Sequence, residues 1–318
     1  MSVPTTAKGY ESLVRWAGVF GTVRCAGVEG TSSYGAGITR YLRTAAIPVT
    51  EVERPKRRHL HRSGKSDSRD AESAARAVLA GETAGEPKSA DGRVEMIRTS
   101  RTARRSTVKP RTQAANQLRC LRVTAPDGLR HRLRGLSTKE LVAVAARFRL
   151  KDDPDDVLEA SRFALRSAAR RYEEVLSEEI AQLEVQLDRL VGETAPELVS
   201  LPGIGTEHAA TLLIVVGDNP ERLKSEASFA SLCGVSPVQA SSGKVVRHRL
   251  NRGGNRDANR TLYMICMVRM SRDRRTKEYV ARRTAEGKSR REIVRCLKRY
   301  VAREVYRVLV PAASPIGS

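Results

Sequence analysis

The sequence predicts an α/β domain at the N-terminal end, a helical spacer, and a mainly helical domain at the C-terminal end. Three observations predict this fold class. A strand, a helix and a second strand alternate between residues 22 and 53. Apolar residues recur at steps of three and four between residues 155 and 192. A glycine-containing segment, residues 201–205, precedes an apolar helix. Strand-forming and purely helical segments therefore occupy different parts of the chain.

The N-terminal elements predict a pair of parallel strands. Residues 9–20 have the spacing of a short amphipathic helix. Residues 22–28 read as a buried strand that ends at Glu29, and residues 47–53 as a second strand after a helix over 38–45. Because a helix joins the two strands, they should run parallel. Glu29 then lies at the carboxyl end of its strand, where open α/β sheets bind ligands.

The spacer is predicted from two long helical patterns. An arginine-rich helix spans residues 93–122, and Pro110 should kink or interrupt it. Residues 155–192 form a second helical segment with a coiled-coil-like seam. The seam consists of Leu165, Ala169, Tyr172, Leu176, Ile180, Leu183, Leu187 and Leu190. It suits a partner helix, a second copy of the chain, or an antiparallel hairpin within one chain.

The last third has the pattern of a helix–hairpin–helix, in which residues 201–205 precede a helix over 209–216. Such a glycine hairpin lets backbone N–H groups approach phosphates. A short helix and turn at 229–237 and two closing helices, 256–271 and 290–309, complete this domain. We therefore place the domains at residues 1–90, 91–196 and 197–318.

Composition points to a polyanionic partner. The 318 residues include 58 Lys and Arg against 36 Asp and Glu, a formal net charge of +22. Nucleic acid suits this excess, and an anionic membrane surface is the rival. No apolar run approaches the ~20 residues that span a bilayer. No secretory signal opens the chain, so we expect a soluble, cytoplasmic protein. The five cysteines show no Cys-x-x-Cys spacing, which argues against a zinc or redox motif.

An acidic cluster is the first candidate for chemistry. Asp67 and Asp70 lie three residues apart at a predicted helix start, so both carboxylates face the same way. If the sheet brings Glu29 close, three carboxylates converge. Oxygen ligands of this kind suit Mg²⁺ or Mn²⁺, which assist phosphodiester chemistry. Taken alone, the two aspartates are better explained as a helix cap and a first-turn residue.

Basic residues form two further groups. Ser241, Ser242 and a glycine lie in a segment whose cations are Lys244, Arg247, Arg249 and Arg252. A serine needs activation to act as a nucleophile, and from spacing alone a polar loop explains this segment better. The second group, Arg98, Arg101, Arg105 and Lys109, shares one face of the arginine-rich helix. The net charge favours phosphate contacts for both groups over solvated surface.

Four motifs occur together in order: Val28-Glu-Gly-Thr-Ser-Ser-Tyr-Gly-Ala-Gly37, Gly64-Lys-Ser-Asp-Ser-Arg-Asp-Ala-Glu-Ser-Ala-Ala-Arg-Ala77, Leu201-Pro-Gly-Ile-Gly205, and Ser241-Ser-Gly-Lys with Arg252-Gly-Gly-Asn255. Each motif alone is weak, but the ordered set resembles the insertion sequence 110 family of transposases over essentially the whole chain. The resemblance implies a RuvC-like (ribonuclease H-like) N-terminal domain, a coiled-coil spacer and a C-terminal transposase domain.

The resemblance also implies roles for individual residues. The family's acidic site has the order Asp, Glu, Asp, Asp, and Glu29, Asp67 and Asp70 match its last three positions. Ser242 matches the serine nucleophile, with Ser241 in reserve. The expected cofactor is Mg²⁺ or Mn²⁺. The expected partners are element and target DNA, a structured guide RNA encoded by the element, and further copies of the chain.

The chain departs from the family at the first acidic position. Residues 1–8 contain no Asp or Glu, and the family places its first Asp on a strand before the helix at residues 9–20. We therefore expect an N-terminally truncated chain, produced by a misplaced start codon or by decay of the element. The rival hypothesis from another class is a catalytically inactive protein that only binds nucleic acid.

Overall fold

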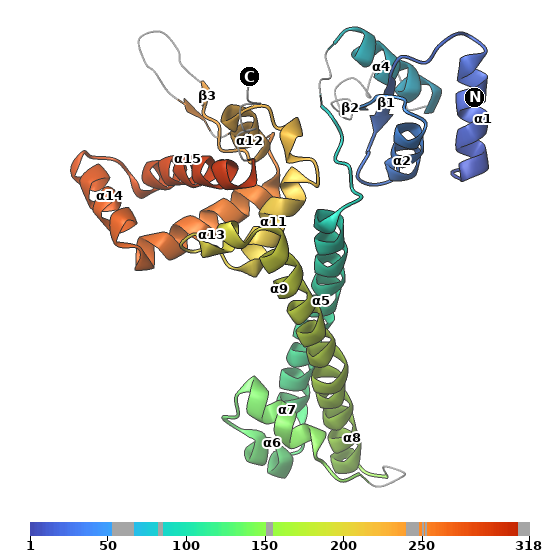
Figure 1. Cartoon of the computed structure of the whole chain (residues 1–318). Helices are drawn as coiled ribbons and strands as arrows, with labels where there is room; N and C mark the ends of the chain where they lie inside the picture. The colour runs from blue at the N-terminus through green and yellow to red at the C-terminus, as the bar shows by residue number, and fades with distance from the viewer. Residues whose placement is uncertain are drawn as a thin grey trace. The chain divides into compact units, whose positions relative to one another are not determined.

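The computed structural model describes residues 1–52, 67–81, 85–150, 155–239, 248–249, 251 and 253–310 (Figure 1). This part of the chain is mostly helical and contains two short strand pairs. It divides into two compact units, one formed by residues 1–94 with 212–318 and the other by residues 95–211. The predicted three-domain division stays a prediction.

The N-terminal region contains the predicted strand–helix–strand arrangement. Helix α1 (Ala7–Gly18) precedes β1 (Ala26–Glu29), α2 (Ala36–Thr44), β2 (Val49–Val52) and α4 (Asp67–Leu79). Strands β1 and β2 run parallel, with Glu29 opposite Val52, which confirms the predicted direction. The first strand is predicted to begin at residue 22. It begins at Ala26, because only Ala26 to Glu29 pair with β2. Among the described helices, none is long and apolar enough to cross a membrane.

Close packing joins α4 to β1. A Cβ atom at Gly27 of β1 would lie 2.8 Å from Val78 Cγ2 and 3.1 Å from the Ala74 carbonyl oxygen, both in α4. Only a residue without a side chain permits this approach. Gly27 thereby fixes the distance between the strand that ends at Glu29 and the helix that begins with Asp67.

The unit of residues 95–211 is a helical hairpin with a small insert. Its helices are α5 (Arg93–Thr124), α6 (Asp127–Leu133), α7 (Thr138–Ala146), α8 (Val157–Arg170), the π-helix η1 (Arg171–Ser177), α9 (Glu178–Thr194) and α10 (Pro196–Ser200). Helix α5 continues through Pro110, so of the predicted kink or interruption the interruption is wrong. Burial of one face compensates for the lost backbone hydrogen bond, because tertiary packing supplies most helix stability.

The predicted seam packs on α5 of the same chain (Figure 1). Arg104 donates to Glu184 at 2.6 Å, and Thr107 donates to Glu179 at 3.0 Å, so α5 and α9 run antiparallel. At the other end of α5, apolar residues from α5 to α8 share one core. These are Leu118, Ala125, Leu129, Leu133, Leu141, Val142, Ala145, Phe148, Leu165, Ala168 and Ala169. Of the three arrangements that the sequence leaves open, the described residues form the hairpin within one chain.

The C-terminal region begins at α11 (Thr206–Val216), after a turn in which Gly203 has a φ of 77°. With α10 before it, this arrangement matches the helix–hairpin–helix pattern. It continues with η2 (Pro220–Arg222), α12 (Glu226–Leu232), β3 (Val238–Gln239), β4 (His248–Arg249), α13 (Arg256–Arg272), α14 (Arg274–Ala285) and α15 (Arg290–Leu309). Helix α14 is absent from the sequence prediction. It begins where the Asp273 side chain accepts a hydrogen bond from the Thr276 backbone at 2.8 Å.

The described end of the predicted 81–91 linker is anchored on the C-terminal region. The Asn219 carboxamide accepts from the Ser89 backbone at 3.0 Å, and the Asp218 carboxylate accepts from the Val94 backbone at 2.7 Å. Ser89 and Asn219 are both buried. These contacts explain why the two chain segments, 1–94 and 212–318, belong to one compact unit.

Candidate active site

Two of the predicted carboxylates line the same cavity. Glu29 is the last residue of β1, and Asp70 lies in the first turn of α4. Both contribute to a cavity of about 450 Å³ whose other lining residues are apolar or glycine, among them Leu13, Ile38 and Ala74. The close packing at Gly27 brings the two elements together. Glu29 and Asp70 therefore line one cavity, and their joint action as metal ligands stays a prediction.

The third predicted carboxylate, Asp67, is the first residue of α4, and its side chain lies outside the described part of the chain. Among the side chains that are described, no group of three or more His, Cys, Asp and Glu is placed to hold a metal ion. The donor chemistry nevertheless suits a hard cation. Two carboxylates in an otherwise apolar cavity carry a charge that a divalent ion would offset.

A turn of small residues covers the end of β1. Gly30 has a φ of 65°, a conformation that favours glycine. A Cβ atom at Gly35 would lie 2.6 Å from the Glu29 carbonyl oxygen. The Thr31 hydroxyl donates to the Glu51 carboxylate at 2.7 Å and ties the turn to β2. The small residues thus let the chain fold back directly over Glu29.

Most of the predicted serine segment lies outside the described residues, including Ser241, Ser242, Lys244, Arg247 and Arg252. Strands β3 and β4 on either side of it pair antiparallel, with Val238 opposite Arg249. Arg249 is exposed. The shared site of the serine and the carboxylates stays a prediction.

Two glycine turns meet at the base of this segment. A Cβ atom at Gly254 would lie 2.1 Å from the Gly234 backbone nitrogen. The Asn259 carboxamide donates to the carbonyl oxygens of Cys233, at 3.0 Å, and Gly234, at 2.9 Å. Its oxygen accepts from the buried Lys298 ammonium at 2.9 Å. These residues fix the two chain ends that lead into the serine segment. The sequence motif contains Gly254, but the roles of Asn259 and Lys298 depend on tertiary contacts.

Asn259→Ala is expected to lower the free energy of unfolding by roughly 2–3 kcal/mol, since it removes the acceptor of a buried charge and two backbone bonds. Burial lowers the pKa of Lys298. The cost of burying its charge is therefore fully present at neutral pH and declines as pH rises toward the ordinary lysine value of about 10.4. Chemical denaturation at pH 7 and pH 10 should show a smaller Asn259→Ala effect at pH 10.

The exposed Asn116 of α5 supplies the matched control, and Asn116→Ala should change stability by less than about 0.5 kcal/mol. A stability loss for Asn259→Ala that grows between pH 7 and pH 10 contradicts the assignment of Lys298 as the buried charge.

The predicted basic face of α5 is partly used inside its own unit. Arg101 is mostly buried and bonds Glu207 of α11 at 2.7 Å. Arg98 bonds Glu95 at 2.5 Å, and this hydrogen bond raises the pKa of Arg98. Arg105 and Lys109 are exposed. Nucleic-acid contact by this face stays a prediction.

The chain is similar to known transposases over two ranges. A family model described as "Transposase IS116/IS110/IS902 family" matches residues 195–281. The DEDD transposase model of IS110 elements, described as "Transposase", matches residues 1–125. The first range contains Ser242, and the second contains Glu29, Asp67 and Asp70.

A curated relative supports the same assignment. The "Insertion element IS110 uncharacterized 43.6 kDa protein" of Streptomyces coelicolor is 34% identical over 110 residues. The alignment covers 34% of this chain and 27% of the relative, so the chain spans about a quarter of that protein's length. Because two models of one family match in chain order, over residues 1–125 and residues 195–281, and a curated relative agrees, the chain belongs to the IS110 family of transposases.

Proposed function

We propose that this protein is the transposase of an insertion sequence, which cuts and rejoins DNA strands with a divalent metal and a nucleophilic serine. The observation that carries the proposal is the convergence of Glu29 and Asp70 on one cavity. The matched DEDD model supports divalent-metal dependence. In this proposal Asp67 joins them, and the three carboxylates hold Mg²⁺ or Mn²⁺. A bound divalent ion would stabilise negative charge on the phosphate oxygens.

The proposed reaction is a balanced exchange of phosphodiester bonds. The Ser242 hydroxyl oxygen loses its proton and forms a bond to phosphorus, while the bond from phosphorus to a sugar oxygen breaks and that oxygen takes up a proton. A sugar hydroxyl of a second strand then attacks the same phosphorus and releases the serine. The number of phosphodiester bonds is conserved, so the reaction needs no nucleotide cofactor. The carboxylates would hold a divalent ion, which would supply positive charge beside the reacting phosphate.

The proposed partners follow from the family and from charge. Element and target DNA suit the net charge of +22. On the basis of the family resemblance, we propose that the protein binds a structured guide RNA and forms a homo-oligomer. A chain that binds nucleic acid without joining strands is the second candidate, and the basic surfaces alone would support it.

A strand-joining assay with the full chain, element DNA, the element-encoded RNA and Mg²⁺ tests the proposal. Wild-type protein should give joined DNA and a protein–DNA species that survives denaturing electrophoresis. Ser242→Ala should give neither, and the adjacent Ser241→Ala should retain both. Loss of the covalent species in Ser241→Ala alone would move the nucleophile to Ser241. Absence of joined product with wild type contradicts the enzyme proposal and leaves the binding protein.

A further inference from the structure

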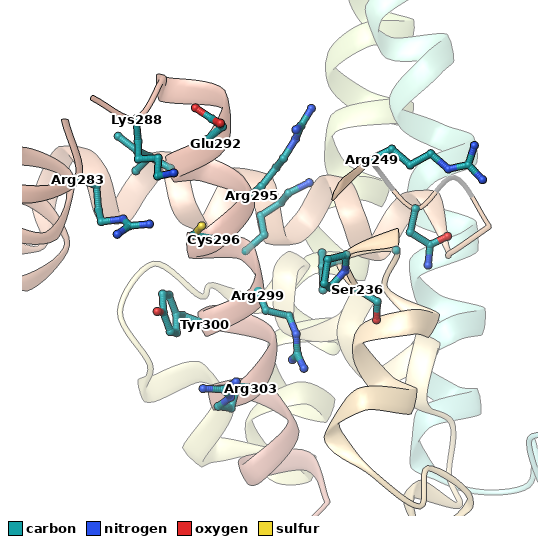
Figure 2. Close-up of a pocket in the computed structure, with 16 residues that line it drawn as sticks. Ser236, Arg249, Arg283, Lys288, Glu292, Arg295, Cys296, Arg299, Tyr300 and Arg303 are labelled. Carbon is teal, nitrogen blue, oxygen red and sulfur yellow. The ribbon is translucent and has the colours of Figure 1, made fainter. Parts of the chain in front are cut away.

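A cationic cavity of about 880 Å³ lies in the C-terminal region (Figure 2). It is lined by the end of α14, by α15 from Glu292 to Arg303, by the turn after α12, and by β4. Its cationic residues are Arg249, Arg283, Lys288, Arg295, Lys298, Arg299 and Arg303, and Glu292 is the carboxylate in its lining. Cations from several elements thus surround one hollow.

Several of these cations are already engaged inside the protein. Arg299 bonds Glu226 at 2.8 Å, and Arg303 lies 3.7 Å from the same carboxylate. Arg283 is paired with Glu286. Lys298 donates to Asn259. These residues line the cavity, but their internal partners already bind or offset their positive charge, so they attract an anionic ligand less.

Three cations remain available in the described part of the chain. Arg249, Lys288 and Arg295 are exposed, and none of them forms an ion pair with a described carboxylate. The nearby Glu292 is committed to the start of α15, where it accepts from the Ser289 backbone at 2.9 Å. Hydrogen bonds from the Ser289 hydroxyl, first, and from its backbone N–H lower the pKa of Glu292, and Lys288 and Arg295 add to the effect. The cavity therefore presents cationic groups that an anionic ligand can bind.

An aromatic ring lies among the cations. Tyr300 is 51% exposed and lines the cavity. Its ring packs edge-on against Tyr279 at 5.7 Å between centroids, and the Arg303 guanidinium lies 5.9 Å from its centre. A rigid ring beside several cations suits a ligand with both phosphates and flat apolar groups, as in a nucleic-acid strand.

We propose that this cavity binds the phosphodiester backbone of the DNA strand that reacts, with Arg249, Lys288 and Arg295 contacting phosphates. The inference deepens the proposed function and rests on it. DNA is favoured over RNA because β4, which carries Arg249, directly follows the chain segment with Ser242. Arg249 and Ser242 are therefore near neighbours along the chain, and we infer that the strand bound by Arg249 is the one that Ser242 attacks. The cations position the backbone and take no part in bond breaking.

Lysine footprinting of the full-length protein tests the site. Lys288 lines the cavity, whereas Lys277 is an exposed lysine of α14 outside it. With element-end DNA bound, acetylation of Lys288 should slow at least fivefold while that of Lys277 changes less than twofold, as read by peptide mass spectrometry. Equal protection of both lysines overturns the proposal. Protection by RNA of the same sequence but not by DNA overturns the choice of DNA.

Paired charge removal gives a second test. Lys288→Ala/Arg295→Ala should reduce the salt dependence of DNA binding by about 1.5 in the log–log slope, because two phosphate contacts are lost. Lys277→Ala/Arg290→Ala removes the same charges from exposed positions outside the cavity and should leave the slope unchanged. Equal salt-dependence slopes for the two double variants contradict the site.

The two proposals fail separately. If the wild-type protein joins strands but DNA does not protect Lys288, the cavity proposal fails and the proposed function stands. If DNA protects Lys288 but no joined product forms, the enzyme proposal fails and the cavity proposal stands.

Discussion

Glu29→Gln is expected to slow DNA strand joining about a thousandfold, a loss of roughly 4 kcal/mol of transition-state stabilisation. The substitution keeps the size of the side chain and removes one negative charge from the cavity that Glu29 shares with Asp70. A metal site with fewer carboxylates holds a divalent ion less tightly and polarises the phosphate less. Calorimetric titration with Mn²⁺ should show weaker binding, a readout independent of strand joining.

Glu51→Gln is the matched control for this experiment. Glu51 lies on the neighbouring strand β2, outside the lining of the cavity, and accepts from Thr31. The glutamine oxygen can accept the same hydrogen bond, so joining and Mn²⁺ affinity should both stay within about threefold of wild type. Equal losses in the two variants would show that charge anywhere on this sheet matters, and that Glu29 has no special position.

Local patterns predict the acidic region because its geometry is set by short-range rules. A helix that joins two adjacent strands requires them to run parallel, which places Glu29 at the end of β1. The sequence leaves open whether Asp70 comes close. That depends on how tightly α4 packs on β1, and Gly27 decides the packing through contacts with residues about fifty positions away.

Charged residues show where sequence reasoning ends. Arg101 has the spacing of a phosphate-binding residue, yet it bonds Glu207 more than a hundred positions along the chain. Lys288 and Arg295 lie in a segment that carries only the family resemblance, and the structure places them in a cationic cavity. A charge run has the same sequence pattern in both cases. The tertiary partner decides whether the charge is spent inside the fold or remains available to a ligand.

The pairing of two glycine turns gives the largest stability prediction. Gly254→Ala is expected to lower the free energy of unfolding by about 3 kcal/mol, the upper range for overpacking. The added Cβ would lie 2.1 Å from the Gly234 nitrogen and 2.3 Å from its Cα, so backbone must move. Gly234 cannot adapt easily, because its φ of 66° already places it in the left-handed region.

Thermal unfolding of the full chain provides the measurement, and the expected fall in Tm is about 6–10 °C for a unit of this size. Gly253→Ala is the control, since its Cβ would lie 3.4 Å from the Asn251 side-chain oxygen, an ordinary contact. It should change Tm by less than about 2 °C. If Gly254→Ala and Gly253→Ala have the same Tm, the two turns do not touch in solution. A large loss at Gly254 alone, with strand joining lost at temperatures where the variant stays folded, would show that the base of the serine segment must be rigid for the serine to reach its phosphate.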